Sequence, residues 1–249
     1  MKLHAKTLLA GLAATALVGA ANAAVVLDAN LFGSFSNTTS TASQTESLTF
    51  NSAGSDKIVV TISTRVQSSV ASVTYSGESL TEIGSITNGN MYTGIWYTDA
   101  ATLSNGDLVF SPAAGDFGLR GSTYGIYALS GTTDGTALDF GGSTTSSVTL
   151  DAPEGAFVVG TFGTEANDTG TVNAPLTQAG TASANTGGGA QGYDELVSSS
   201  DASATYSIAW VPGTSTNLVT YGAVFVPEPG SLALLGLGGL MMIKRRRRG

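Results

Sequence analysis

The sequence predicts an all-β protein, an antiparallel β-sandwich that is jelly-roll-like or immunoglobulin-like, and three observations support this fold class. Short runs of β-branched and aromatic residues alternate with turn residues along the chain. Serine and threonine make up 62 of the 249 residues, and only 11% of residues are charged, against about 25% in an average globular protein. Between residues 24 and 226, no run of ten or more residues has apolar positions at helical spacing.

About nine strands are expected. Residues 57–64 form the clearest early strand, because Ile58, Val60 and Ile62 share one face. The late strands 205–211 and 218–226 alternate aromatic and aliphatic residues with smaller ones. Such a series fits two stacked sheets better than a small barrel. The other expected strands are 70–76, 91–98, 107–110, 122–129, 147–150 and 156–162.

Two stretches lack strand patterns. Residues 176–200 include Gly187-Gly188-Gly189 and few large apolar side chains, and we expect a long flexible loop there. Residues 37–45 are polar and form either an exposed strand edge or a loop. The expected body of the protein is a single domain over residues 24–226.

The first 23 residues have the three parts of a secretory signal peptide. Lys2 and Lys6 give a basic start, residues 7–20 are apolar, and Ala21-Asn22-Ala23 is a small-residue cleavage site. A buried N-terminal helix is the alternative, but it does not account for this order. We therefore expect export and a mature chain that starts at Ala24.

The last 23 residues contain a second signal. Pro227-Glu228-Pro229 interrupts regular structure, and the apolar residues 231–243 follow. A helix of that length rises about 20 Å, which is shorter than the roughly 30 Å hydrocarbon core of a bilayer. It would span the membrane only if the basic side chains after it snorkelled or the bilayer thinned locally. The basic end favours the cytoplasmic side, which places the body in the periplasm. The expected stop-transfer residues are Lys244, Arg245, Arg246, Arg247 and Arg248.

These three features in this order resemble the PEP-CTERM sorting signal of Gram-negative bacteria, over about 24 residues. The resemblance implies processing by an exosortase near Pro227-Glu228-Pro229, followed by release or transfer to the cell surface. Members of that class are often associated with exopolysaccharide and with biofilm or floc formation. The alternatives are an ordinary C-terminal anchor, and a basic tail that binds nucleic acid but leaves the apolar run in water.

A second resemblance concerns the fold alone. Residues 72–81 contain a strand and a Gly-x-x-Leu-Thr turn, and the strand with Ile95-Trp96-Tyr97 follows. This pattern, with residues 127–131 further on, resembles β-sandwich modules of secreted bacterial proteins. It implies a fold and no activity.

Charge and composition exclude several functions. Only Lys57, Arg65 and Arg120 are basic between Lys6 and Lys244, against 18 acidic residues, which gives that stretch a charge of about −15. Such a surface repels nucleic acid. The chain has no cysteine, and its one histidine, His4, lies in the expected leader. Disulfides, thiolate ligands, a Ser-His-Asp triad and a histidine zinc site are therefore excluded from the mature chain.

Carboxylates and aromatic rings remain as candidate site groups. A two-carboxylate glycosidase would use Glu78 with Glu82, Glu165 with Asp168, or Asp194 with Glu195. Calcium could take oxygen ligands from Asp134, Asp139 and Asp168, although the sequence has no EF-hand loop and assigns no metal site. The candidate sugar-stacking rings are Trp96, Tyr97, Tyr124, Tyr127, Tyr206 and Trp210, most of them expected in the core.

Tyr97 and Tyr127 are out of phase with Ile95 and Ile126, so we expect these two rings to be exposed and available for sugar contact. The function predicted overall is an exported, non-catalytic structural or adhesive protein of the cell surface or extracellular matrix. The alternatives are a calcium-assisted carbohydrate-binding module and a two-carboxylate glycoside hydrolase. The expected partners are an exosortase, the inner membrane and polysaccharide, and no cofactor is expected apart from the Ca²⁺ of the alternative.

Overall fold

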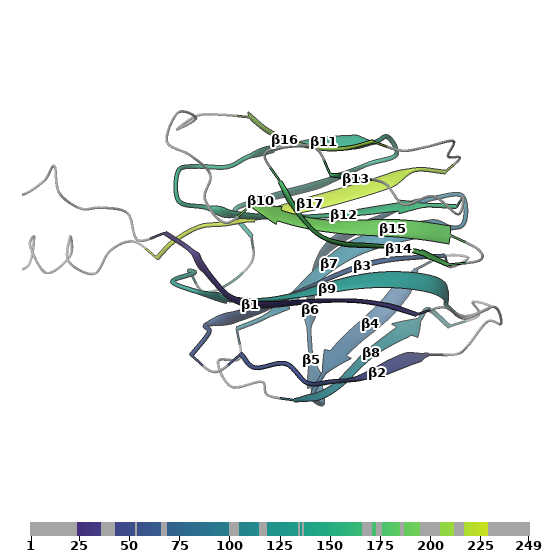
Figure 1. Cartoon of the computed structure of the whole chain (residues 1–249), viewed down its shortest axis with the longest axis horizontal. Helices are drawn as coiled ribbons and strands as arrows, with labels where there is room; N and C mark the ends of the chain where they lie inside the picture. Colours follow the sequence, from purple (N-terminus) through teal and green to yellow (C-terminus); the bar gives the residue numbers. More distant parts are fainter. Residues whose placement is uncertain are drawn as a thin grey trace, which may run out of the picture.

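The computed structural model is an antiparallel all-β structure, as the sequence predicts. Every regular element in its described residues is a β-strand, and Figure 1 shows the strands in stacked layers. No helix in this part of the chain is long and apolar enough to cross a membrane. The structure describes residues 24–35, 43–52, 54–65, 69–99, 105–114, 119–133, 135, 137–165, 171–172, 176–184, 187–194, 205–211 and 217–228.

The first half of the chain forms two sheets. The larger sheet has the strand order β1-β9-β3-β7-β6, and the smaller has the order β2-β8-β4-β5. The strands are β1 (Val26–Phe35), β2 (Gln44–Leu48), β3 (Lys57–Arg65), β4 (Val70–Tyr75), β5 (Glu78–Ser79), β6 (Thr81–Asn88), β7 (Met91–Thr98), β8 (Gly106–Pro112) and β9 (Arg120–Ser130).

The second half also forms a larger and a smaller sheet. Their strand orders are β10-β17-β12-β15-β14 and β11-β16-β13. The strands are β10 (Asp139–Ser143), β11 (Ser147–Asp151), β12 (Phe157–Thr164), β13 (Thr171–Val172), β14 (Thr177–Ala184), β15 (Gly187–Asp194), β16 (Thr205–Val211) and β17 (Val219–Phe225).

The second half repeats the topology of the first. Matching β1–β4 with β10–β13, and β6–β9 with β14–β17, converts one pair of strand orders into the other, apart from the short strand β5, which has no counterpart among the described residues. In each unit, early strands pair with late strands of the same unit, and the strands are divided between two sheets. This is the strand order of a jelly roll. The equivalent strands β3 and β12 also agree in sequence, because Val59, Thr61 and Thr64 recur one hundred residues later as valine, threonine and threonine. The described residues therefore form two similar antiparallel β-units in tandem, each with this strand order.

The two larger sheets pack face to face. Strand β3 lies against β12, β1 against β14, and β6 against β10. The central strand β3 faces its own counterpart β12, and each edge strand faces the counterpart of the strand at the opposite edge of its sheet. A two-fold axis along the strands would produce this relation. Val59 and Tyr127 on one sheet pack with Phe157, Val159 and Tyr221 on the other. This shared core joins the two units.

The smaller sheets cover the outer faces of the larger ones. Ile62, Trp96 and Phe110 belong to the core under β2-β8-β4-β5, and Phe162 and Val224 to the core under β11-β16-β13. The central strands are consequently buried on both faces, as β12 is along its whole length. The stack has four layers, and the two-layer arrangement expected from the sequence is wrong in this respect.

The expectation of a long loop is also wrong for the described part of residues 176–200. Strands β14 and β15 form a hairpin that ends at the Ala184–Gly187 pair, and β15 pairs with β12 as well. Pairing with a buried neighbour outweighs the low strand propensity of Gly187-Gly188-Gly189. Gly180 makes room for Phe32 of the first unit, since a Cβ on Gly180 would lie 2.2 Å from the Phe32 Cγ.

Candidate functional site

The two ends of the described chain meet at one end of the stack, where Figure 1 shows β1 beginning and β17 ending. The Val25 N–H donates to the Gly155 carbonyl (3.0 Å), and the Glu228 N–H donates to the Gly131 carbonyl (2.9 Å). Pro227 forms a β-bridge with Thr132. We call the site formed by residues 24–25, 131–133, 155 and 226–228 the terminal junction.

Two glycines shape the terminal junction. Gly131 (φ 71°) follows β9, and Gly155 (φ 78°) precedes β12, and both adopt the left-handed conformation that glycine allows most easily. A Cβ on Gly155 would lie 3.6 Å from both the Ala24 Cα and the Pro227 Cγ. The expected first residue of the mature chain therefore lies beside the start of the Pro-Glu-Pro motif.

Residues 225–248 match the family model of the PEP-CTERM protein-sorting motif. The chain therefore carries a PEP-CTERM sorting signal. This signal marks an exported protein that an exosortase sorts and that is anchored in the membrane transiently before release at the cell surface. No curated protein and no solved structure matches the chain.

The PEP-CTERM match overlaps the folded body. It starts at Phe225, the last residue of β17, and the backbone of residues 226–228 hydrogen-bonds to the body. The rest of the signal lies outside the described residues, namely Pro229, the apolar segment 231–243, Lys244, Arg245, Arg246, Arg247 and Arg248. The expected leader, residues 1–23, lies outside them too.

A polar cluster closes the opposite end of the interface between the two units. Glu165, at the end of β12, accepts hydrogen bonds from the side chains of Asn90 (3.0 Å) and Asn217. It also forms an ion pair with Arg65, at 2.8 Å. The hydrogen bonds from Asn90 and Asn217, together with the charge of Arg65, lower the Glu165 pKa below its ordinary value of 4.5.

This environment is the opposite of what a general acid needs, because a catalytic acid has a raised pKa. Asp168, the expected partner of Glu165, lies outside the described residues, as does Glu195, the expected partner of Asp194. Glu78 and Glu82 are exposed on β5 and β6. The glycosidase alternative thus gains no support from the described carboxylates.

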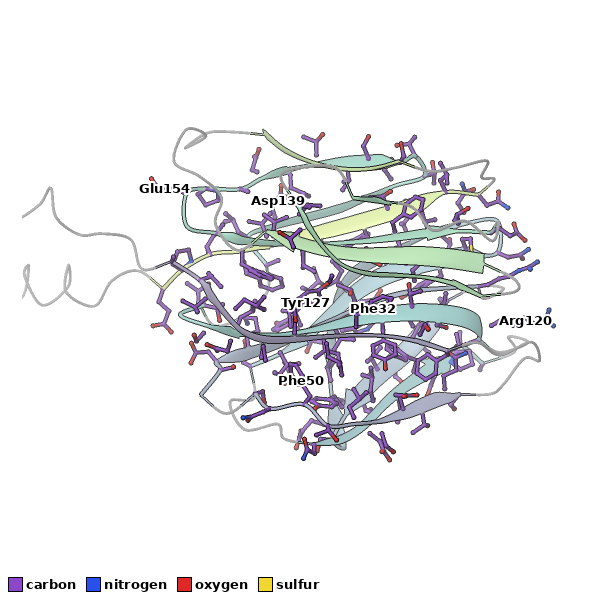
Figure 2. All side chains as sticks on the ribbon, viewed as in Figure 1. Phe32, Phe50, Arg120, Tyr127, Asp139 and Glu154 are labelled. Atoms are coloured by element: carbon purple, nitrogen blue, oxygen red, sulfur yellow. The ribbon has the colours of Figure 1, made fainter. Side chains whose placement is uncertain are left out.

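Charge is distributed unevenly between the two ends of the stack. Figure 2 shows Glu154 at the end that holds the terminal junction and Arg120 at the other end. Arg65 pairs in register with Arg120 and so lies at that other end too. The acidic residues near the terminal junction are Asp28, Asp56, Asp99, Asp139, Asp151, Glu154 and Glu228, as the strand register and hydrogen bonds place them.

The aromatic rings expected to contact sugar are buried. Tyr97 is 8% exposed and Tyr127 is fully buried. Both point away from the face that carries Ile62 and Trp96, but that second face packs on the other unit. The phase assigned to Tyr97 is also wrong, because Ile95 and Tyr97 are two residues apart on β7 and share this second face. The prediction of exposed rings is therefore wrong. Trp96 and Tyr124 lie in the core, and the side chains of Tyr206 and Trp210 lie outside the described part.

The calcium alternative also lacks an assembled site within the described residues. No group of three or more acidic or histidine side chains there could hold a metal ion. Asp139 accepts hydrogen bonds from the backbone N–H of Phe140 and Asp151, at 2.9 Å and 2.7 Å. Asp134 and Asp168 lie outside the described residues.

One charged group in the core was not singled out by sequence reasoning. Lys57 is only 1% exposed, at the start of β3. Its Nζ pairs with Asp99, donates to the Gly135 carbonyl at 2.8 Å, and lies 4.6 Å from the centre of the Tyr97 ring. A lysine that begins an apolar strand carries no signal of these distant partners.

Glu165 provides a pH-dependent test of the polar cluster. Because its folded pKa is lowered, it contributes stability that is fully present above pH 4.5 and is lost as pH falls through the folded pKa. We expect the free energy of unfolding of Glu165→Gln to depend less on pH than that of the wild type in this acid range. Denaturant titrations at several pH values measure the difference. Parallel curves for the two proteins would contradict the assigned contacts.

Proposed function

We propose that the body is a non-catalytic structural or adhesive component of the cell surface or extracellular matrix, associated with exopolysaccharide or biofilm. The observation that carries the proposal is the meeting of Ala24 and Pro227 at one end of the stack. The expected leader, residues 1–23, and the rest of the sorting signal, residues 229–249, both connect to the body at this end. Until processing, the body stands on the periplasmic side of the inner membrane, with the end that carries Arg65 and Arg120 pointing away.

The outer surface of the first unit supports a structural role. Sheet β2-β8-β4-β5 buries one face against the core, and its other face carries short polar side chains. The described residues on that face include no aromatic ring that could stack on a sugar. The partly or fully exposed positions are Thr45, Ser47, Ser72, Thr74, Asp107, Val109 and Ser111.

The acidic surface suits this role too. A stretch with three basic and 18 acidic residues repels its own copies, which keeps the released protein dispersed. Contact with polysaccharide would then use hydroxyl and amide groups. Hydrolysis of the polysaccharide is not part of the proposal.

Removal of the tail tests the sorting part of the proposal. We expect full-length protein to be processed and to reach the cell surface or the medium. A chain that ends at Gly230 keeps the terminal junction but lacks the membrane segment, so it should be exported and remain unprocessed in the periplasm. Fractionation and intact mass distinguish the two. If both chains reached the same place in the same processed form, the proposal would fail.

A binding assay tests the matrix part. The purified mature protein should be retained by exopolysaccharide from the same cells without releasing sugar fragments, whether or not calcium is present. Retention that requires calcium would favour the carbohydrate-binding module instead. Released oligosaccharides would favour the glycosidase. Equal thermal stability of the mature protein and the chain ending at Gly230 is the control for folding.

A further inference from the structure

Residues 226–228, which we call the strap, belong both to the sorting signal and to the folded body. The Val226 carbonyl accepts from the Thr133 N–H (3.2 Å), and the Glu228 N–H donates to the Gly131 carbonyl (2.9 Å). Pro227 lies between these bonds in a β-bridge with Thr132. The strap is thus paired with the segment after β9 along its whole length.

The strap also completes the core of the second unit. Val226 is half-buried and packs against the cluster that contains Phe162 and Val224. Removing the strap would expose this cluster and leave the Thr133 N–H and the Gly131 carbonyl without their backbone partners. The mature fold therefore depends on keeping these three residues.

An enzyme that cleaves a peptide segment binds it in extended form and uses its backbone groups for hydrogen bonds. Two of the strap's backbone groups, the Val226 carbonyl and the Glu228 N–H, are already engaged by the body, so they become available only after local opening. The first backbone beyond the strap begins at Pro229. The peptide bonds that join residues 225 to 228 are therefore protected while the body is folded.

We propose that processing breaks a peptide bond on the C-terminal side of Glu228, so that the strap stays on the mature protein. This inference rests on exosortase processing as stated above. The carbonyl carbon of the broken bond passes to water or to an amine acceptor. The released nitrogen takes up a proton and becomes the amino terminus of the membrane segment.

Intact mass and C-terminal peptide mapping of the mature protein from its own cells test the position. We expect chains that end at Glu228 or later, and the mass separates a free carboxylate from an amine adduct. Mature chains that end at Pro227 or earlier would overturn the inference. A chain that still ends at Gly249 would instead contradict exosortase processing itself, so the two failures are distinguishable.

A glycine substitution tests whether the strap gives the protection. A Cβ on Gly131 would lie 3.2 Å from the Ala24 carbonyl oxygen, at a φ of 71°, so Gly131→Ala should loosen the strap. We expect about tenfold more chains that end within residues 225–227, from the left-handed strain of alanine. Gly54→Ala is the matched control, with φ 93° and open space around its Cβ. Identical termini in both variants would overturn the protective role.

Discussion

Replacing Tyr127 with alanine is expected to lower the free energy of unfolding by about 3–5 kcal/mol, the range for large aromatic residues in a packed core. Tyr127 is fully buried between the two larger sheets, and its ring centre lies 6.0 Å from that of Phe157 on the other unit. The substitution removes contacts from both units at once. Denaturant unfolding monitored by circular dichroism measures the loss.

Phe140→Ala is the matched control. Phe140 also carries an aromatic ring on a strand of a larger sheet, but it is 45% exposed. We expect this variant to lose less than about 1 kcal/mol. If Tyr127→Ala lost no more than Phe140→Ala, Tyr127 would lie on the surface, and the sugar-contact prediction would return. Because the units share one core, the wild type should unfold in a single transition.

Asp99→Asn is expected to cost about 2 kcal/mol. Breaking a buried ion pair usually costs 3–5 kcal/mol, and we reduce this figure because the Asp99 side chain is 39% exposed. The variant leaves Lys57 with a full charge, almost no exposure to water, and only the Gly135 carbonyl and the Tyr97 ring as the other contacts described here. Thermal and denaturant unfolding at neutral pH measure the cost.

The double variant Lys57→Met with Asp99→Asn separates the charge from the packing. Methionine fills much of the lysine volume without charge, so the double variant should recover most of the stability that Asp99→Asn loses. Equal losses in the single and double variants would show that Asp99 acts through its own hydrogen bonds and not through the buried ammonium group.

The strands that the sequence predicts well are those with a local pattern. β3, β7, β9 and β12 are runs of β-branched and aromatic residues, and their expected bounds lie within two residues of the observed ones. β14 and β15 have no such pattern. They are stabilised by pairing, β15 with the buried β12 and β14 with β15. Local propensity does not contain this information.

The duplication has a weak sequence signal that strand patterns alone do not reveal. The valine and threonine matches of β3 and β12, one hundred residues apart, are its clearest part. Strand patterns without this repeat predict two layers, and hence the wrong exposure of Tyr97 and Tyr127. In a four-layer stack both faces of a central strand are covered, so phase does not separate core from surface.

The sorting signal could be predicted from sequence because its three parts are consecutive. Its contact with Ala24 could not, since the two ends are two hundred residues apart and meet only through Gly131 and Gly155. The polar cluster around Glu165 could not be predicted for the same reason. Its partners Arg65, Asn90 and Asn217 come from both units and meet only when the larger sheets pack.

Site-specific labelling tests the orientation of the tethered body most directly. The natural chain has no cysteine, so Glu154→Cys and Thr144→Cys each place one exposed thiol, the first beside the terminal junction and the second in the connection between β10 and β11 at the opposite end of the stack. In spheroplasts of cells that lack the processing enzyme, a membrane-impermeant fluorescent maleimide should label both. A lipid headgroup quencher should then quench the label at position 154 strongly and the label at position 144 weakly. Equal quenching, or no labelling until the cells are lysed, would contradict a body held outside the inner membrane by its terminal junction.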